Sequence, residues 1–280
     1  MSTVAQVIRH KAELVAGYLV KQPRPGTRPL VVSMQGPQGS GKSTICARLV
    51  DVLREKGVVA AAASLDDFYL PHAGLTALAA ANPSNAMLAG RGPPGTHDVD
   101  LLVDTLSQVH SPRGGEVVLP VFDKAAHGGR GDRAGYTVPV PAGLDVFVLE
   151  GWSLGYGPLP DTEARARWAV GRTARTHPYS SMAQVNTLLA AFEGQVGRFF
   201  DCHVAIRPMT FDYVYTWRLE QEHMMKEKNG GKGMSDEDVR RFVDRYMPVY
   251  EVFGEVRPHR PTFSLLFGPE REIVATEEEG

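Results

Sequence analysis

The sequence predicts an α/β fold in which a mostly parallel sheet is covered by helices on both faces. Short, nearly continuous apolar segments at residues 30–34, 58–65, 144–149 and 203–206 are typical of strands that are buried on both sides. Segments with apolar residues at helical spacing alternate with these strands. Such alternation indicates a parallel sheet, because each crossover between parallel strands needs a long connection, usually a helix.

Size and charge limit the possible architectures and partners. The chain has 280 residues, of which 43% are hydrophobic, and a formal net charge of −2. We expect one domain over residues 1–280, with helical and loop insertions that act as lids. A near-neutral balance argues against nucleic acid or an anionic membrane as partner. No apolar run approaches the roughly 20 residues that a membrane span requires, and the first 21 residues lack the apolar core of a secretory signal. We therefore expect a cytoplasmic protein, with a monomer favoured.

The first half of the chain begins with an expected amphipathic helix at residues 1–21 and a proline- and glycine-rich linker at 22–29. A strand at 30–34, a helix that Gly57 ends and a strand at 58–65 follow. Residues 71–98 are poor in strand signals and include a helical alanine patch at 75–81. Asp98 is the expected cap of a helix that runs to residue 109. We expect a third strand at 116–121 and then a polar loop at 122–136.

The second half continues with the strand at 144–149, a helix at 185–192 and the strand at 203–206. Two long helices are predicted at 212–227 and 236–250, the second capped by Ser235. The glycine-rich turn at 229–233 joins them and is a candidate mobile element. A last strand is predicted at 262–267, and the acidic residues 276–280 are expected to form a disordered tail.

One motif predicts that the chain binds a nucleotide. Residues 36–43 satisfy the phosphate-loop pattern G-x-x-x-x-G-K-[S/T], between a predicted strand and a predicted helix. In this context the glycines let backbone N–H groups point at phosphate oxygens, at the positive end of the helix. The pattern therefore predicts a P-loop NTPase fold that binds ATP or another nucleoside triphosphate. The predicted nucleotide-binding residues are Gly36, Pro37, Gln38, Gly39, Ser40, Gly41, Lys42, Ser43 and Thr44.

Acidic side chains follow two of the predicted strands, at the sheet edge where ligands gather. Glu150 ends one strand, and with the Ser43 hydroxyl it is a candidate ligand of Mg²⁺. Asp66 and Asp67 end another strand. We expect Asp66 to accept a proton from a substrate hydroxyl or to orient Mg²⁺, while Lys42 contacts the transferred phosphoryl group. Asp pairs also cap helices, so a purely local role for this pair stays open.

Two polar loops are the candidate binding site of a second substrate. Residues 91–98 are stiffened by two prolines, and residues 122–136 are rich in glycine and charge. Cations in such loops suit the capture of a small carboxylate or phosphate, although solvated Arg–Asp pairs are the alternative. The predicted substrate-binding residues are Asp67, Tyr69, Arg91, His97, Asp98, Lys124, Arg130 and Arg133. His97, Asp98 and Asp100 do not have the spacing of a metal site.

A phosphoryl-transfer site also needs a closing element that supplies positive charge. Arg218 follows Trp217 in a segment rich in aromatic residues, so it is the candidate catalytic arginine of the lid. Arg165, Arg167, Arg172 and Arg175 are weaker candidates, for which a solvated basic surface is favoured. Cys46 and Cys202 are expected to be buried and reduced.

Taken together, these residues resemble the plant and fungal type of D-glycerate 3-kinase, a group of P-loop small-molecule kinases related to uridine, pantothenate and phosphoribulose kinases. The resemblance rests on the phosphate loop and on the segments at 64–69, 91–98, 123–133, 150–152, 217–222, 233–237 and 246–248. It implies that Asp66 is the base in the D-x-F-Y position of the family. The segment 125–127 departs from the more usual serine-containing version.

The resemblance implies Mg·ATP-dependent phosphorylation of D-glycerate to 3-phosphoglycerate. Two alternatives stay open at this point. One is a kinase for another small molecule, such as pantothenate, a nucleoside or a different sugar acid. The other is a nucleotide-dependent switch or assembly ATPase, which would hydrolyse ATP slowly and act through a partner.

Overall fold

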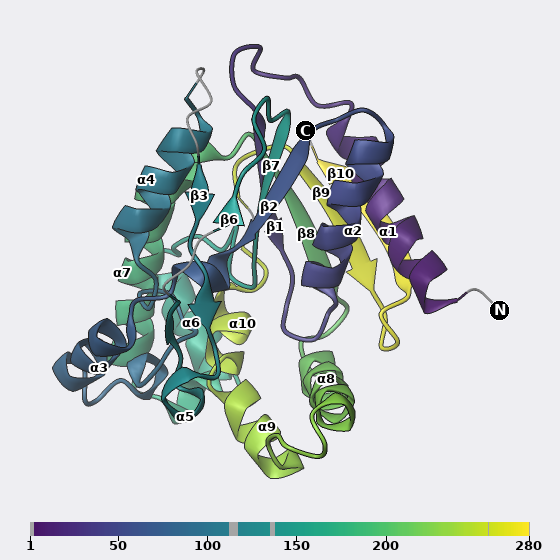
Figure 1. Ribbon diagram of the computed structural model, residues 1–280. Helices are drawn as coiled ribbons and strands as arrows, with labels where there is room; N and C mark the ends of the chain where they lie inside the picture. The colour runs from purple at the N-terminus through teal and green to yellow at the C-terminus, as the bar shows by residue number, and fades with distance from the viewer. Residues whose placement is uncertain (1–2, 112–116, 135–137, 257, 280) are drawn as a thin grey trace.

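The computed structural model describes residues 3–111, 117–134, 138–256 and 258–279. Its centre is a six-stranded sheet with the strand order β10-β9-β8-β1-β7-β2 (Figure 1). The strands β2, β7, β1, β8 and β9 are parallel to one another, and the edge strand β10 is antiparallel to β9. The predicted fold class is confirmed.

The strands of this sheet are β1 (Leu30–Gln35), β2 (Ala60–Ser64), β7 (Val146–Gly151), β8 (Cys202–Pro208), β9 (Thr262–Phe267) and β10 (Ile273–Glu279). Two short hairpins lie outside it: β3 (Val118–Leu119) with β6 (Val138–Pro139), and β4 (Phe122–Asp123) with β5 (Asp132–Arg133). The helices are α1 (Val4–Leu19), α2 (Lys42–Glu55), α3 (His72–Ala81), α4 (Val99–Val109), α5 (Ala126–Gly129), α6 (Asp161–Val170), α7 (Tyr179–Val196), α8 (Tyr213–Lys228), α9 (Asp236–Asp244) and α10 (Met247–Phe253).

Helices cover both faces of the sheet, with α1 and α2 on one side and α4 and α7 on the other (Figure 1). Alternate residues of β1 point to opposite faces, because side chains alternate along a strand. Val32 and Met34 pack with α1 and α2, whereas Val31 packs with Leu102 and Leu106 of α4. Both faces are therefore apolar near the centre, which explains the continuous apolar runs in the sequence.

A third apolar cluster holds α7 to α10 together beside the sheet. It includes Trp152, which directly follows β7, together with Tyr246 and Tyr250. The Trp152 ring contacts both tyrosine rings edge-on, with centroids 5.1 Å apart in each pair. This cluster fixes α10 next to the loop that leaves β1, while α8 and α9 lie beyond the carboxyl ends of the strands (Figure 1).

Two expected helix caps are present in the structure, and one expected helix is divided in two. Asp98 caps α4 by accepting a hydrogen bond from the Leu101 amide (3.1 Å), and Ser235 caps α9, as predicted. The helix predicted at residues 236–250 is instead two helices, α9 and α10. Pro248 lacks the N–H that would continue the ladder, so the helix ends before it. The helix α6 was not predicted.

The strand expected at residues 116–121 is wrong as a member of the main sheet. Residues 118 and 119 form β3, which pairs with β6 outside that sheet. Pro120 follows at once, and a proline cannot donate to a strand ladder. Residues 116, 135 and 136, which also belong to predicted segments, lie outside the described residues.

The expected disordered tail is also wrong. Residues 276–279 belong to β10 and pair with residues 262–265 of β9; Gly280 lies outside the described residues. The pairing uses backbone groups, which acidic side chains do not prevent. Exposed charges on an edge strand also discourage pairing with other chains.

Within the described ranges, no helix is both long enough and apolar enough to cross a membrane.

The correction at β10 can be tested by truncation. Removal of residues 274–280 deletes most of the β9–β10 ladder, so we expect the free energy of unfolding to fall by about 2 kcal/mol. Urea denaturation of the truncated and full-length chains measures this difference. A frayed tail would leave the unfolding midpoint unchanged.

Candidate active site

The phosphate loop joins β1 to α2 at the carboxyl edge of the sheet. Gly39 and Gly41 have φ values of +71° and +84°, a region that side chains disfavour. A Cβ on Gly39 would lie 2.6 Å from the Trp217 backbone, so only glycine fits against α8. Gly41 precedes α2, and the first turn of that helix carries Lys42 and Ser43. The loop therefore presents backbone N–H groups at a helix N-terminus, as anion binding requires.

Glu150 connects this loop to the neighbouring strand. Its carboxylate is 5% exposed at the end of β7. Ser43 donates a hydrogen bond to Oε1 (2.8 Å), and Lys42 Nζ lies 3.7 Å from Oε2. Oε2 accepts no hydrogen bond from the described residues. A buried carboxylate oxygen with spare acceptor capacity, beside a hydroxyl, fits a hard divalent cation such as Mg²⁺.

Asp66 lies on the other side of Lys42, in the 3₁₀ turn that follows β2. Tyr69 donates its hydroxyl to Oδ1 (2.9 Å), and Lys124 lies 2.5 Å from Oδ2. Burial alone would raise the pKa of Asp66, but Lys124, Lys42 and the two hydrogen bonds lower it to about 2. The carboxylate is thus ionised and held in one orientation.

The Asp67 carboxylate has different neighbours from the Asp66 carboxylate. It accepts a hydrogen bond from the Phe122 amide (3.1 Å), and burial raises its pKa. It lines a cavity together with Ser43 and Glu150. Among the described residues, the acidic side chain that shares the cavity with the candidate Mg²⁺ ligands is therefore Asp67, whereas Asp66 faces Lys124.

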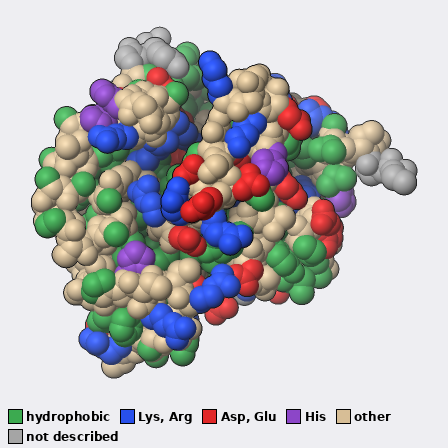
Figure 2. Space-filling model, turned by 90° about the horizontal axis from the view of Figure 1, so that it is seen from below, with side chains coloured by type: hydrophobic (Ala, Val, Ile, Leu, Met, Phe, Trp, Pro, Cys, Tyr) green, Lys and Arg blue, Asp and Glu red, His purple; other side chains and the backbone are tan. Residues whose placement is uncertain are grey.

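The predicted substrate loops meet the sheet at this same edge. Figure 2 views the molecule from that side and shows Lys and Arg side chains beside Asp and Glu side chains near the centre of the face. The cations and carboxylates come from segments far apart in the sequence.

His97 and Tyr69 form one wall of the site. Their rings stack with centroids 4.5 Å apart, and the two residues form an antiparallel bridge. His97 is 5% exposed, and its Nε2 atom has no hydrogen-bond partner among the described residues. Burial lowers the pKa of His97 to about 4, so the ring is neutral at pH 7. Its Nε2 atom is therefore a neutral, buried ring nitrogen whose bonding capacity is not used by the described residues.

Arg133 and Asp98 are committed to each other. Arg133 Nη2 donates to Asp98 Oδ2 (2.9 Å) and to the Tyr69 carbonyl (3.0 Å). Asp98 also caps α4. This pair thus joins the two predicted substrate loops, and its direct geometric role is to hold them together.

Arg91 and Arg130 are less engaged. Arg91 donates to the Gly129 carbonyl (2.6 Å) and lies over the Phe122 ring. The Arg130 side chain is exposed, and it has no hydrogen bond or ion pair within the described ranges. Both guanidinium groups retain free donors.

Arg218 lies at the junction of α8 and α9. It pairs with the buried Glu222 (2.8 Å) and packs over the Phe242 ring. Glu222 also accepts the Met234 amide (2.7 Å), so it fixes the turn between the two helices. Nη1 of Arg218 is buried without a partner among the described residues. Arg218 thus packs against an aromatic ring, but this ring comes from α9 and not from the aromatic segment around Trp217 on which the prediction was based.

The residue-by-residue predictions missed two contacts from α10 and the segment before it. The Tyr250 hydroxyl accepts the Gln38 amide of the phosphate loop (3.2 Å). Arg245 donates to the Arg91 carbonyl (3.5 Å), and its Nε is buried and unpartnered within the described ranges. Neither residue lies in a motif, and both are brought to the site by the apolar packing of α10.

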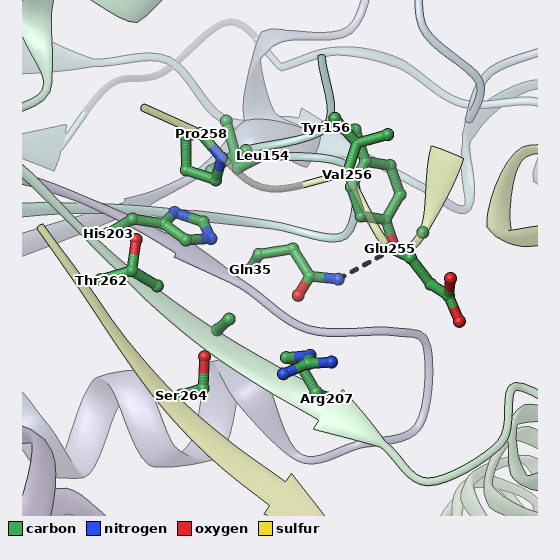
Figure 3. Close-up of a pocket in the computed structure, with 13 residues that line it drawn as sticks. Gln35, Leu154, Tyr156, His203, Arg207, Glu255, Val256, Pro258, Thr262 and Ser264 are labelled. Carbon is green, nitrogen blue, oxygen red and sulfur yellow. Dashed lines mark hydrogen bonds between the residues drawn. The ribbon is translucent and has the colours of Figure 1, made fainter. Parts of the chain in front are cut away.

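A second cavity lies behind the phosphate loop, on the polar face of β1, β8 and β9 (Figure 3). Gln35, the last residue of β1, donates to the Trp152 carbonyl and to the Tyr156 hydroxyl (both 3.1 Å). His203 pairs with Ser33 (2.7 Å), and burial lowers its pKa to about 3. None of the predicted site residues lines this cavity.

The neutral state of His97 predicts a pH dependence of stability. Its pKa is about 4 in the folded protein against 6.5 in the unfolded chain, so only the unfolded chain gains this proton as the pH falls from 6.5 to 4. Stability therefore decreases over this range, by up to about 1.4 kcal/mol per pH unit for one group. We expect His97→Phe, which keeps a ring against Tyr69, to flatten this slope in urea denaturation at pH 6.5, 5.5 and 4.5.

The exposed His10 provides the control, because His10→Phe should leave the slope unchanged. An unaltered slope in His97→Phe would contradict the assignment.

Comparison with known proteins identifies the family. No family model matches the chain. The chain is 39% identical over 237 residues to the uncharacterized kinase mug58 of Schizosaccharomyces pombe. The aligned residues cover 83% of this chain and 84% of that protein. It is 37% identical over 229 residues to the chloroplastic D-glycerate 3-kinase of Arabidopsis thaliana, over 80% of this chain and 48% of that protein.

A solved structure agrees with these matches. The D-glycerate 3-kinase from Cryptococcus neoformans superposes with a TM-score of 0.88 and 36% identity, over 100% of both chains. The resemblance drawn from the motifs is confirmed, and the chain belongs to the D-glycerate 3-kinase-like family of ATP-dependent P-loop kinases.

Proposed function

We propose that this chain transfers the γ-phosphoryl group of ATP, with Mg²⁺, to the 3-hydroxyl of D-glycerate and so forms 3-phosphoglycerate. The observation that carries the proposal is the position of Asp66, an ionised carboxylate near the phosphate-loop lysine and paired with Lys124 of a substrate loop. Relatives described as D-glycerate 3-kinases support the choice of acceptor.

The nucleotide end of the site would hold ATP and its metal ion. Backbone N–H groups of the phosphate loop and the Lys42 ammonium would bind the phosphates. Ser43 and Glu150 would hold Mg²⁺, with Asp67 in the same cavity. When bound, the ion neutralises negative charge on the phosphates. The spare oxygen of Glu150 and the oxygen-only donor set fit this group.

The acceptor hydroxyl would be oriented by Asp66. The oxygen of this hydroxyl forms a bond to the γ-phosphorus, while the bond between that phosphorus and the bridging oxygen of ADP breaks. The proton of the hydroxyl passes to Asp66, which Tyr69 keeps in place. Lys42 and Arg218 stabilise the charge that develops on the transferred group.

The substrate carboxylate provides a way to activate this base. Lys124 neutralises Asp66 in the absence of substrate, at 2.5 Å. A carboxylate that binds Lys124 would draw the ammonium away from Asp66. Loss of that pairing raises the pKa of Asp66, and a carboxylate with a higher pKa is a stronger base. An acid, unlike a neutral alcohol, would thus promote its own phosphorylation.

The remaining cations suit a carboxylate as well. Arg91 and Arg130 retain free guanidinium donors, which bind carboxylates in a bidentate manner. His97 offers a neutral ring nitrogen for a hydroxyl group. Arg133 and Asp98 hold the loops in register through their mutual ion pair.

The acid requirement separates this proposal from a kinase that acts on a neutral nucleoside. Steady-state kinetics with D-glycerate and with glycerol, which lacks the carboxylate, provide the test. We expect kcat/KM to be at least about 100-fold higher for D-glycerate, because glycerol has no carboxylate to pair with the loop cations or to draw Lys124 away from Asp66. Equal values would contradict the proposal, and ATP hydrolysis that neither compound changes would favour the nucleotide-dependent switch.

The role of Asp66 generates a mutational prediction. Asp66→Asn keeps the shape of the side chain but removes its basicity, so kcat should fall by about 10²–10⁴-fold. ATP affinity should persist, because the phosphate loop is intact. Product formation and calorimetric ATP binding measure the two quantities.

The same substitution at the exposed Asp104 of α4 is the matched control and should leave turnover unchanged. Turnover of Asp66→Asn within about threefold of the parent would exclude Asp66 as the base.

A further inference from the structure

The turn between β9 and β10 reaches the phosphate loop from outside the site. Arg271, in this turn, has φ +61°, and His127 is the one other non-glycine residue of the described ranges with positive φ. Such backbone conformations persist only where surrounding contacts enforce them. The turn itself is closed by the bond from the Gly268 amide to the Glu272 carbonyl (3.0 Å).

The Arg271 guanidinium makes contacts in three directions. Nε donates to the carbonyl of Gly39 in the phosphate loop (2.7 Å), and Nη2 donates to the Trp217 carbonyl of α8 (3.3 Å). Nη1 lies 2.7 Å from Glu220. One planar side chain thus links the β9–β10 turn, the phosphate loop and α8, a task for which the donor fork of arginine is suited.

Two further bonds hold the turn in place. Lys11 of α1 donates to the Arg271 carbonyl (2.5 Å), and Trp217 donates its indole N–H to the Pro269 carbonyl (2.6 Å). Lys11 is 5% exposed. The backbone of the turn is therefore held at Pro269 and at Arg271, in addition to the contacts of the guanidinium.

The contact with Gly39 bears on the shape of the phosphate loop. The Gly39 carbonyl points outward to Arg271, so the amide of the same peptide, on Ser40, points into the loop, where it donates to Pro37 (3.3 Å). Tyr250 accepts the preceding Gln38 amide from the other side (3.2 Å). The tip of the loop is thus held by contacts with both Arg271 and Tyr250.

We propose that Arg271 is a positioning residue of the nucleotide site. It fixes the peptide between Gly39 and Ser40 and so preorganises the phosphate loop for the triphosphate. Preorganisation improves affinity because less order must be imposed on binding. The inference depends on the nucleotide site of the proposed function and not on the identity of the acceptor.

The decisive variant is Arg271→Gly, studied in the full-length chain. Glycine adopts φ +61° without strain, so the substitution removes the guanidinium and leaves the turn intact. We expect Kd for Mg·ATP, measured by titration calorimetry, to rise about tenfold, as the loss of one charged hydrogen bond would cause. The thermal unfolding midpoint should stay within about 2 °C of the parent, because glycine relieves backbone strain.

Two more variants separate positioning from bulk charge. Arg271→Lys keeps the charge but cannot bridge Gly39, Trp217 and Glu220 together, so it should restore only part of the affinity. Glu220→Gln removes the ion pair but keeps the bond to Gly39, and ATP affinity should stay within about twofold of the parent.

Three results would overturn the proposal: an Arg271→Gly protein that binds Mg·ATP within twofold of the parent, an Arg271→Lys protein with full affinity, or equal losses in Arg271→Gly and Glu220→Gln. If Arg271→Gly does not fold, the comparison of Arg271→Lys with Glu220→Gln decides by the same criteria. A parent protein that binds no ATP would instead contradict the nucleotide site itself.

Discussion

The buried carboxylate of Glu150 is the constraint on which the rest of the site depends. Its burial at the end of β7 is costly unless positive charge or hydrogen bonds compensate it. Lys42 and Ser43 supply both, and both lie in the first turn of α2. The ion pair therefore fixes the phosphate loop relative to the sheet edge. Oε2, which lies 3.7 Å from the Lys42 ammonium, accepts no hydrogen bond from the described residues and so keeps acceptor capacity for a cation.

On the acceptor side a lysine likewise compensates a carboxylate, but this ion pair is more exposed to solvent. Asp66 is balanced by Lys124, which is more exposed than Lys42 and belongs to a loop outside the main sheet. A pairing with such a residue is easier to exchange than one within the core. The nucleotide end of the site is thus rigid, whereas the acceptor end is built from charges that a small acid could rearrange.

Sequence reasoning succeeded where the relevant contacts are local. The phosphate loop, Asp66 and Glu150 follow from strands and turns that short apolar runs identify, and the sheet brings their ends together. It failed where the partner is distant along the chain. Arg271 and Tyr250 contact the phosphate loop across 232 and 212 residues, and no motif marks either one.

Other failures have equally physical causes. The acidic tail has the composition of a disordered segment, yet its backbone pairs with β9. Backbone pairing of this kind cannot be predicted from composition. Arg133 and Asp98 were predicted to bind substrate from their charge and position, and the structure pairs them with each other, which is the alternative that the sequence left open. Charge in a loop shows that a residue needs a partner but not which partner it has.

The most direct test of the account is the identity of the product. The protein is incubated with Mg·ATP and D-glycerate, and phosphorus NMR distinguishes 3-phosphoglycerate from 2-phosphoglycerate. We expect 3-phosphoglycerate in a one-to-one ratio with ADP, since Asp66 would orient the primary hydroxyl while the cations hold the carboxylate. Formation of 2-phosphoglycerate, or release of ADP without a phosphorylated acid, would contradict it.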